Sequence, residues 1–166
     1  MGRHLLCQPV IYKSKTELIL MTSHLESTVQ CKDERKRQLE QVLINMTGQP
    51  PQATVIFGGD TNLRDAEVSA VGGLPSGVVD AWEECGSPAD SKFTWDVSIN
   101  DNLVWEYPRK PRLRFDRLFT RRAQGTCSLK ATKVELVGME RLAGCRRFPS
   151  DHWGVCCEFS QSSNPK

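Results

Sequence analysis

The sequence has 166 residues, of which 39% are hydrophobic, enough for the core of one ordinary domain. Its net charge of +2 excludes a protein that binds nucleic acid as a uniform polycation, so any such affinity requires local clustering. Basic residues do cluster between Trp105 and Arg122, at Arg109, Lys110, Arg112, Arg114, Arg117, Arg121 and Arg122. Seven scattered cysteines without a C-x-x-C pair predict neither a disulfide framework nor a zinc site, and they favour a reducing compartment. We expect no membrane span, because no stretch approaches ~20 apolar residues.

The chain begins with the pattern of a hairpin followed by a helix. Leu5 to Tyr12 and Glu17 to Ser23 are apolar, β-prone runs separated by a polar tetrapeptide. His24 follows the second run. From Asp33 onward apolar residues recur at helical spacing, and this amphipathic helix should stop at Gly48.

A short apolar run from Ala53 to Phe57 predicts a buried strand that leads directly into Asp60. A short helix should then begin at Asp65. Further strands are expected at Val78 to Trp82, Phe93 to Asp96, Phe115 to Phe119, Val134 to Val137 and His152 to Phe159. Strands outnumber helices, so we predict a layered α/β (α+β) fold in which helices flank a sheet and long loops carry the functional residues.

Polar residues of catalytic type follow several of these strands. Gly58-Gly59-Asp60-Thr61-Asn62 places a carboxylate and an amide two residues apart after flexible glycines, so both side chains can face one phosphate. An Asx turn that caps the next helix is the equally weighted structural alternative. Asp151 and His152 pair a carboxylate with an imidazole at the start of the last strand, a weak signal by itself.

His24 and Asp116 extend this set. A lone histidine beside a strand is more often structural, but His24 lies at a strand end like the others. Asp116 lies in an apolar run, where an unpaired carboxylate would be costly to bury, so it should have a partner. A histidine is the natural partner, because the carboxylate fixes the tautomer of the ring.

The ordered motifs SHLES, GGDTNLRD, FTWD, RFDR and FPSDHWG resemble the endonuclease/exonuclease/phosphatase family. That resemblance implies a DNase I-like fold, a two-layered β-sandwich flanked by helices. HLES, TNLRD, GGLP, DAWE, TWD and SDHWG resemble, more narrowly, the branch of the family that acts on 5′-phosphotyrosyl–DNA bonds. The motifs extend from Met1 to about Phe159.

The resemblance also implies roles for individual residues. Asp60 and Asn62 would contact the attacking water and the phosphate, while His24 and His152 would lie on either side of the scissile phosphoryl group. Asp116 would orient His152.

Further residues would bind the phosphate and the metal. Ser27 would donate a hydrogen bond to the phosphate, and Arg64 would contribute positive charge. Asp60 and Asp151 would hold Mg²⁺, with Mn²⁺ as the alternative ion, mostly through water.

A narrow groove for a single-stranded 5′ end would lie beside these residues. The resemblance assigns it to Trp95, Leu103, Arg112, Arg114 and Phe115, as expected for base stacking on an aromatic ring and attraction of the backbone to arginine. From the residues alone, core packing is the stronger expectation for Trp95, and a solvated face is the stronger expectation for the Arg/Lys run.

The sequence also departs from the family pattern. It contains neither the Asn-bearing first strand nor the Gln-Glu motif that supplies the principal metal-ligating Glu. We therefore expect residues 1–159 to be the C-terminal part of a catalytic domain, 160–166 to be a disordered tail, and this chain alone to be inactive or weakly active.

The function implied by the resemblance is Mg²⁺-dependent hydrolysis of the bond between a protein tyrosine and a DNA 5′-phosphate. Such an enzyme would release trapped topoisomerase 2 during DNA break repair, in the nucleus and also the cytoplasm, with TRAF-type signalling adaptors as further partners. The alternatives are another family activity, such as an apurinic endonuclease or a phosphoinositide phosphatase, and a catalytically incomplete interaction module.

Overall fold

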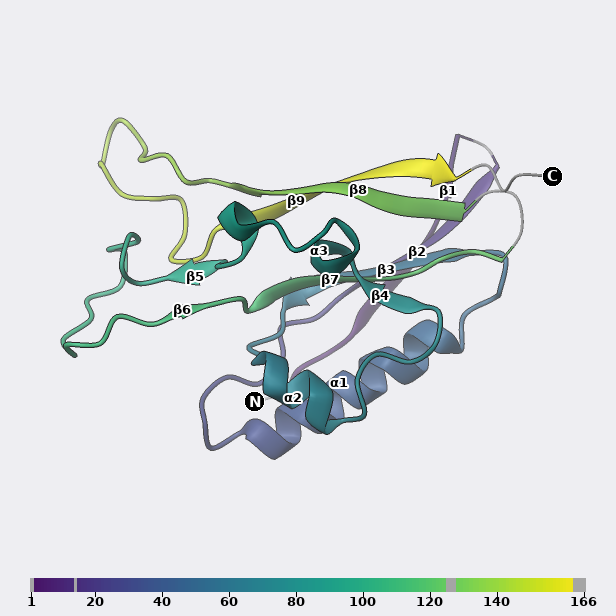
Figure 1. Cartoon of the computed structure of the whole chain (residues 1–166), viewed down its shortest axis with the longest axis horizontal. Coiled ribbons are helices and arrows are strands. Elements are labelled where there is room, and N and C mark those ends of the chain that lie inside the picture. The colour runs from purple at the N-terminus through teal and green to yellow at the C-terminus, as the bar shows by residue number, and fades with distance from the viewer. Residues whose placement is uncertain (1, 14, 125–127, 163–166) are drawn as a thin grey trace.

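The computed structural model describes residues 2–13, 15–124 and 128–162 (Figure 1). Its elements, in chain order, are β1 (Leu6–Tyr12), β2 (Thr16–Thr22), α1 (Lys32–Thr47), β3 (Thr54–Asp60), α2 (Asp65–Ala70), β4 (Val78–Asp80), α3 (Ala81–Glu84), the 3₁₀ turn η1 (Ala89–Ser91), β5 (Trp95–Asp96), β6 (Arg112–Leu113), β7 (Asp116–Arg121), β8 (Ser128–Val137) and β9 (Gly154–Ser162). Within these described ranges, no helix is long and apolar enough to cross a membrane.

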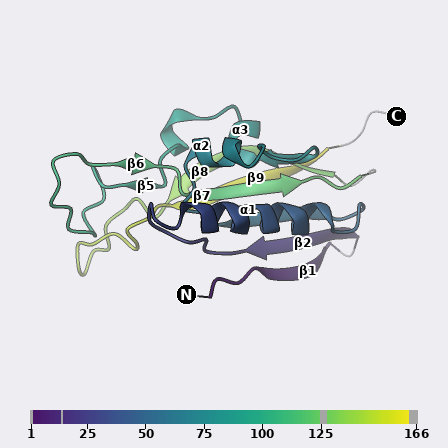
Figure 2. The ribbon, with the colours of Figure 1, turned by 90° about the horizontal axis from the view of Figure 1, so that it is seen from below.

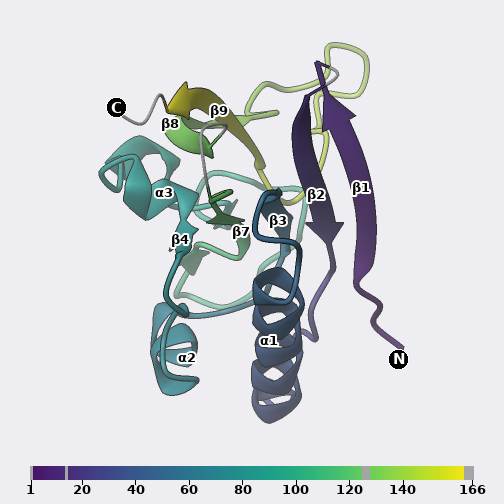
Figure 3. The ribbon, with the colours of Figure 1, turned by 90° about the vertical axis from the view of Figure 1, so that its right-hand side faces the viewer.

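The described strands form one central sheet and two short ribbons. The central sheet has the order β1-β2-β3-β7-β4, in which β2 and β3 are parallel and the other pairs are antiparallel. Helices α1 and α2 lie on one side of this sheet (Figures 2 and 3), and the β8–β9 ribbon lies on the other (Figure 1). The arrangement is a layered α+β fold, as the sequence predicts.

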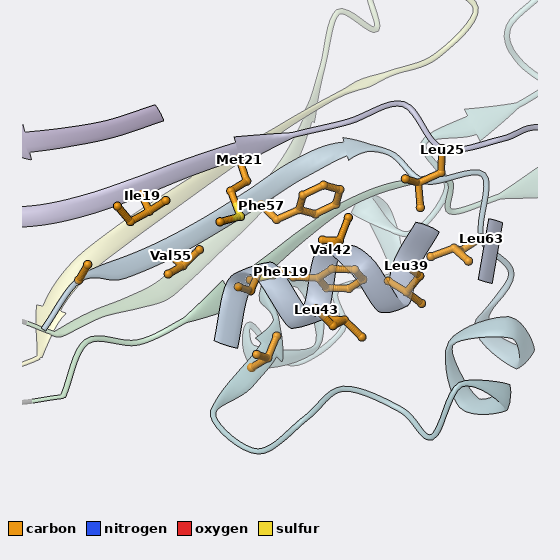
Figure 4. Packing of buried hydrophobic residues seen from close by; sticks show 13 residues of the cluster. Ile19, Met21, Leu25, Leu39, Val42, Leu43, Val55, Phe57, Leu63 and Phe119 are labelled. Atoms are coloured by element: carbon orange, nitrogen blue, oxygen red, sulfur yellow. The ribbon is translucent and has the colours of Figure 1, made fainter. Parts of the chain in front are cut away.

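The main core forms where α1 packs on the sheet (Figure 4). Alternation along β2 turns Ile19 and Met21 to this face, where they meet Phe57 of β3 and Phe119 of β7. The Phe57 and Phe119 rings stack with centroids 5.9 Å apart. Helix α1 contributes its apolar stripe, Leu39, Val42, Leu43 and Met46. Each fully buried side chain of this kind stabilises the fold by about 1.5–3 kcal/mol.

Strand β7 also packs on its opposite face. Leu118 alternates with Phe119 and points to a smaller cluster formed by α3 and the β8–β9 ribbon, in which Ala81, Ala131 and Val134 are buried. The ribbon is therefore held over β7 as a second layer, and β9 brings the residues that precede it to the end of the central sheet.

Most of the predicted elements are confirmed: the hairpin, α1 with Gly48 as its C-cap, β3 ending at Asp60, and α2 beginning at Asp65. The predicted strand from Val78 to Trp82 is wrong in its second half. The backbone turns into α3 after Asp80, because the Asp80 carboxylate accepts a hydrogen bond from the Trp82 amide as an N-cap.

The strand ends differ from the sequence predictions in three other places. Of the strand expected at Phe93 to Asp96, only the last two residues form β5. Strand β5 pairs with β6, and the sequence did not indicate β6. Strand β8 begins at Ser128 rather than Val134, and β9 runs from Gly154 to Ser162 rather than from His152 to Phe159. The tail expected at 160–166 therefore overlaps β9, and residues 163–166 lie outside the described residues.

Candidate active site

His24, Asp60, Asp116 and His152 come together at one end of the central sheet. His24 follows β2, Asp60 ends β3 and Asp116 begins β7. Asp60 and Asp116 are direct partners in the antiparallel β3–β7 ladder. His152 enters from the loop before β9. The structure thus places these predicted residues in one cluster, although they are up to 128 positions apart in the chain (152 − 24).

Close packing of the backbone between β2 and β3 joins His24 to Asp60. A Cβ atom added to Gly59 would lie 2.1 Å from the Ser23 carbonyl oxygen, so only glycine fits here. The Leu25 amide donates to the Asp60 carbonyl at 2.9 Å and continues the contact beyond the strand end. As a result, His24 Nε2 lies 3.3 Å from Asp60 Oδ2.

His152 lies between the two carboxylates. Its Nδ1 is 2.7 Å from Asp116 Oδ2, while its Nε2 is 3.9 Å from Asp60 Oδ2 and 3.9 Å from Asp151 Oδ2. The histidine partner expected for Asp116 is therefore His152. With Nδ1 bound to a carboxylate, Nε2 is the ring atom that faces Asp60 and any bound phosphate.

The charges of this cluster are coupled. Burial raises the pKa of Asp60, and the nearby Asp116 raises it further, against the opposing effects of His152, the Asn62 amide and His24. Burial lowers the pKa of His152, but its hydrogen bond to Asp116 and the charges of Asp116, Asp60 and Asp151 outweigh burial and raise the pKa. The site favours a cationic imidazole beside carboxylates.

Asn62 has the strained backbone of a residue placed for function. It is almost fully buried and adopts a left-handed conformation with φ of 51°. Its side-chain amide donates to the Leu25 carbonyl at 3.2 Å, and its backbone amide donates to Asp60 Oδ1 at 3.0 Å. The Asx turn considered from the sequence is present, but α2 begins with Arg64 as its N-cap, so Asp60 does not cap that helix.

Thr94 is a positioning residue that sequence reasoning missed. Its side chain is buried, and its Oγ1 accepts hydrogen bonds from the Phe115 and Asp116 amides, both at 3.0 Å. Its carbonyl accepts from the Trp153 amide at 2.7 Å. Thr94 thus connects the strand that carries Asp116 to the loop that carries His152. The signal available in the sequence was its place within the FTWD motif.

Two asparagines hold the loop before Asp151. The side-chain amides of Asn100 and Asn102 donate to the Ser150 carbonyl at 2.9 and 3.0 Å. Asn102 also pairs with both backbone groups of Phe148. These contacts fix the approach of the chain to His152, and no periodicity or motif in the sequence indicates them.

Arg64 and Ser27 lie in the loops that border the cluster. The Arg64 guanidinium is 38% exposed and lies 5.8 Å from the centroid of the Phe115 ring. Ser27 is half-buried between β2 and α1, three residues after His24. The Asp151 carboxylate is 40% exposed, so it is open to solvent beside His152.

An aromatic wall continues from the histidine. The Phe115 ring stacks on His152 with centroids 6.3 Å apart, and Trp95 lies 5.6 Å from Phe115. Phe115 is buried whereas Trp95 is half-buried. Leu103 follows in the loop between β5 and β6 and is 44% exposed. At this edge Phe115 therefore packs in the core, while Trp95 and Leu103 form a partly exposed wall.

The basic run does not form the single solvated face that it suggests. Arg114 is 5% exposed and binds Asp80 at 2.6 Å, with its guanidinium 4.4 Å from the centroid of the Trp82 ring. Arg117 and Arg121 are buried as well. The solvated face expected for Arg114 from the residues alone is therefore wrong, because a buried carboxylate holds its guanidinium in the interior, whereas its expected role in substrate binding stays a prediction.

Arg112 keeps a partial place on the surface. Its side chain is 49% exposed, but its Nε donates to the buried Asp96 carboxylate at 2.6 Å. Arg109 and Lys110 are exposed. Of the predicted cluster, these three residues remain available to attract an anionic strand.

The site offers donors of a type that suits a hard cation. Asp60, Asp116 and His152 each place a ligand atom within 4.8 Å of the others. Because Asp116 is hydrogen-bonded to His152, Asp60 is the better carboxylate for an ion, and Asp151 can assist through water. Mg²⁺ binds through one or two carboxylates and retains several waters, so these oxygen donors fit it in type.

Comparisons with known proteins agree with this geometry, although no protein-family model matches the sequence. The chain is 50% identical over 159 residues to tyrosyl-DNA phosphodiesterase 2 of Homo sapiens, a match that covers 96% of this chain and 43% of the human protein. The Xenopus tropicalis protein of the same name is 49% identical over 147 residues, covering 89% and 39% of the two chains. The chain spans about two fifths of the length of these curated relatives.

Solved structures extend the likeness to the fold. The TDP2 of D. rerio complexed with single strand DNA product matches with a TM-score of 0.90 and 46% identity, covering 96% of this chain and 62% of that one. An endonuclease/exonuclease/phosphatase from Beutenbergia cavernae shares the fold with a TM-score of 0.64 at 17% identity, covering 96% and 39%. The chain is thus similar to part of tyrosyl-DNA phosphodiesterase 2, and it shares the fold of the Beutenbergia cavernae endonuclease/exonuclease/phosphatase.

Proposed function

We propose that this chain carries the phosphate-handling residues of a Mg²⁺- or Mn²⁺-dependent phosphodiesterase that acts on the bond between a tyrosine and a DNA 5′-phosphate. The observation that carries the proposal is the cluster in which His24 and His152 both turn Nε2 toward Asp60 Oδ2. A carboxylate flanked by two imidazoles suits a water that attacks an anionic phosphorus. Relatives that are about 50% identical to this chain over the aligned residues indicate the substrate class by their names.

The chemistry is an in-line displacement in which water forms a new bond to phosphorus and the bond from phosphorus to the tyrosine oxygen breaks. Asp60 orients the water and accepts its hydrogen bond. His152, held by Asp116, and His24 stabilise the charge that develops on the phosphoryl oxygens and the departing phenolate. A bound divalent cation supplies further neutralisation of the phosphoryl oxygens. The products are a free tyrosine side chain and a DNA 5′-phosphate.

Asn62 and Arg64 complete the phosphate environment in this proposal. Asn62 is fixed by the Leu25 carbonyl, so its position is set before substrate arrives. Arg64 Nη1 lies 3.8 Å from the buried Glu67 carboxylate, which keeps Arg35 as a partner when the exposed Arg64 guanidinium turns toward the phosphate. Ser27 lies in the same loop as Leu25 and can donate its hydroxyl.

The D. rerio relative was solved with single strand DNA product, which supports a single-stranded 5′ end as the substrate. In the same proposal, adducts of topoisomerase 2 with broken DNA are the physiological targets. The nucleus is the main location, with a further pool in the cytoplasm. TRAF-type signalling adaptors would be separate binding partners.

Release of tyrosine from a 5′-phosphotyrosyl oligonucleotide tests the proposal, with an abasic duplex and a phosphoinositide as competing substrates. We expect release from the first substrate alone, weak for this chain by itself and stronger after fusion to the N-terminal half of a curated relative, dependent on added Mg²⁺ or Mn²⁺ and lost in Asp60→Asn. Preferred cleavage of either competitor would assign another activity of the family. Binding of the oligonucleotide without metal-dependent hydrolysis, in the fusion as well as in this chain, would leave an interaction module and overturn the enzymatic assignment.

A further inference from the structure

The aromatic wall beside His152 does not end at Trp95. Trp105 meets Trp95 edge-on with centroids 5.7 Å apart, and Tyr107 meets Trp105 edge-on at 5.6 Å. Rings thus follow one another from His152 through Phe115, Trp95 and Trp105 to Tyr107. The last two belong to the loop between β5 and β6, which lies beyond the end of the central sheet (Figure 1).

Trp105 fixes the shape of this loop. Its indole Nε1 donates to the Arg109 carbonyl at 2.8 Å and closes a turn around Tyr107. Trp105 itself is half-buried. The turn therefore holds the Tyr107 ring in place at its tip.

The tip of the loop is apolar and open to solvent. Tyr107 is 70% exposed and Val104 is 87% exposed. Exposed apolar side chains in one patch mark binding surfaces more often than isolated ones do. Arg109 and Lys110 follow in the same loop and are exposed. The exposed carboxylates of this loop are Glu106 and Asp101, and Asp101 is paired with Arg141. Aromatic rings beside cations suit a single-stranded nucleic acid.

We propose that the loop from Val104 to Lys110 is a distal subsite that binds the third nucleotide from the 5′ end, with its base on Tyr107 and its phosphate near Arg109 and Lys110. This inference rests on the proposed function, because the 5′ end must lie at His152. It goes further because it assigns how many nucleotides the protein contacts and which residues bind the third one.

The distances between neighbouring ring centroids indicate how many nucleotides the aromatic wall can contact. Bases stacked in a duplex rise by 3.4 Å per nucleotide on each strand. Ring steps of 5.6 and 5.7 Å are longer than that rise, so each step takes one nucleotide of a partly unstacked strand. The first base then lies at Trp95 beside Phe115, the second at Trp105 and the third at Tyr107.

Length-dependent binding tests the subsite without relying on hydrolysis. The probes are 5′-phosphorylated oligothymidylates of two to six nucleotides with a 3′ fluorophore, measured by fluorescence anisotropy. We expect the affinity of the protein to rise from the dinucleotide to the trinucleotide. In Tyr107→Ala the trinucleotide and longer probes should bind about 5- to 150-fold more weakly, as expected for loss of one base–aromatic stack, while the dinucleotide is unaffected.

Two substitutions serve as matched controls. Tyr107→Phe keeps the ring and should retain the length dependence. Tyr12→Ala removes a tyrosine that is 48% exposed beside the β1–β2 turn, and it should leave every probe unchanged. Lys110→Gln should lower the slope of log affinity against log salt by about 0.7 for the trinucleotide, one phosphate contact on a single strand.

Several results would overturn the inference: no binding of any probe, equal affinity for all lengths, or an equal loss for the dinucleotide and the longer probes in Tyr107→Ala. Equal loss would assign Tyr107 to folding of the loop. The proposed hydrolysis is judged separately, by the Asp60→Asn variant. Hydrolysis without length dependence overturns the subsite alone, and length dependence without hydrolysis overturns the enzymatic proposal alone.

Discussion

Asp60 and Asp116 lie directly opposite each other in the β3–β7 ladder, so two carboxylates occupy adjacent strands at the same edge of the sheet. Like charges in this position destabilise a sheet unless a cation lies between them. His152 fills that place, with Nδ1 2.7 Å from Asp116 and Nε2 3.9 Å from Asp60. The imidazole is therefore both a structural counter-charge and the group that faces substrate.

Replacement of Asp116 by Asn tests how far this carboxylate supports the charge and the orientation of His152. Asn keeps the size of the side chain but removes the charge that raises the pKa of His152, so the ring is less often cationic and less firmly oriented. We expect kcat for hydrolysis of a 5′-phosphotyrosyl oligonucleotide to fall about 10²-fold. The fold should persist, as judged by a cooperative thermal transition.

Asp151→Asn is the control for this change. Its carboxylate is 3.9 Å from His152 Nε2 and 40% exposed, so solvent screens its effect. A tenfold or smaller loss is expected. Equal losses in the two variants would show that the total negative charge matters, rather than the hydrogen bond to Nδ1.

Loss of the Thr94 hydroxyl should lower the free energy of unfolding. Thr94→Val keeps the shape of the side chain but leaves the Phe115 and Asp116 amides without their acceptor. An unsatisfied buried amide costs about 1–3 kcal/mol, so we expect the free energy of unfolding to fall by about 2–4 kcal/mol. Urea unfolding measures this loss. Thr94→Ser restores the hydroxyl and should recover most of the stability, and failure to recover it would contradict the role of Oγ1.

The sequence predicted the site residues better than their supports. Asp60 ends a strand, Asn62 follows it and His152 precedes one, and local patterns reveal such positions. Thr94 and Asn100 act through hydrogen bonds to segments 21 or more residues away, which no local periodicity records. Arg114 was misplaced for a related reason: its charge favours a surface, but Asp80, 34 residues earlier, offers a buried partner.

Strand boundaries were harder to predict because a few contacts decide them. Asp80 is the last residue of β4, and the strand ends there because the Asp80 carboxylate caps α3. The start of β8 at Ser128 depends on its pairing with β9, which apolar alternation in one strand does not reveal. The alternation of Trp153, Val155, Cys157 and Phe159 was nevertheless confirmed, since these residues are buried or half-buried while Cys156 and Glu158 are exposed.

Gly59→Ala should disturb the site through the backbone. The new Cβ would lie 2.1 Å from the Ser23 carbonyl oxygen, and main-chain atoms cannot swing away as a flexible side chain can. We expect β2 and β3 to separate near His24, with about 1–3 kcal/mol of lost stability and reduced binding of a 5′-phosphorylated oligonucleotide. Thermal unfolding and anisotropy measure the two effects.

Gly144→Ala is the matched control, because no heavy atom lies within 4 Å of a Cβ added there. It should leave both quantities within the spread of repeat measurements. If Gly59→Ala behaved in the same way, the tight approach of β3 to Ser23 would have no part in placing Asp60.

A buried ion pair between α1 and α2 should make stability depend on pH. Arg35 Nη2 lies 2.5 Å from Glu67 Oε1, with side-chain exposures of 0% and 4%, and the pair joins α1 to α2. Burial acts to raise the pKa of Glu67, but the hydrogen bond from Arg35, aided by the Arg64 amide, outweighs it and lowers the pKa below the ordinary value of 4.5. The folded state therefore binds the Glu67 proton less readily than the unfolded state does.

The sign of the effect follows from that lowered pKa. The contribution of Glu67 to stability is fully present above pH 4.5, its ordinary value, and is lost as pH falls through the lower folded-state pKa. Glu67→Gln should flatten this part of the stability profile and reduce the free energy of unfolding at pH 7 by about 3–5 kcal/mol, since Arg35 is left buried without its charge partner. Glu34→Gln removes an exposed partner of Arg37 and should cost less than about 1 kcal/mol. Urea titrations from pH 3 to 7 compare the variants, and a Glu67→Gln profile as steep as that of the unmodified protein would assign the acid sensitivity to other carboxylates.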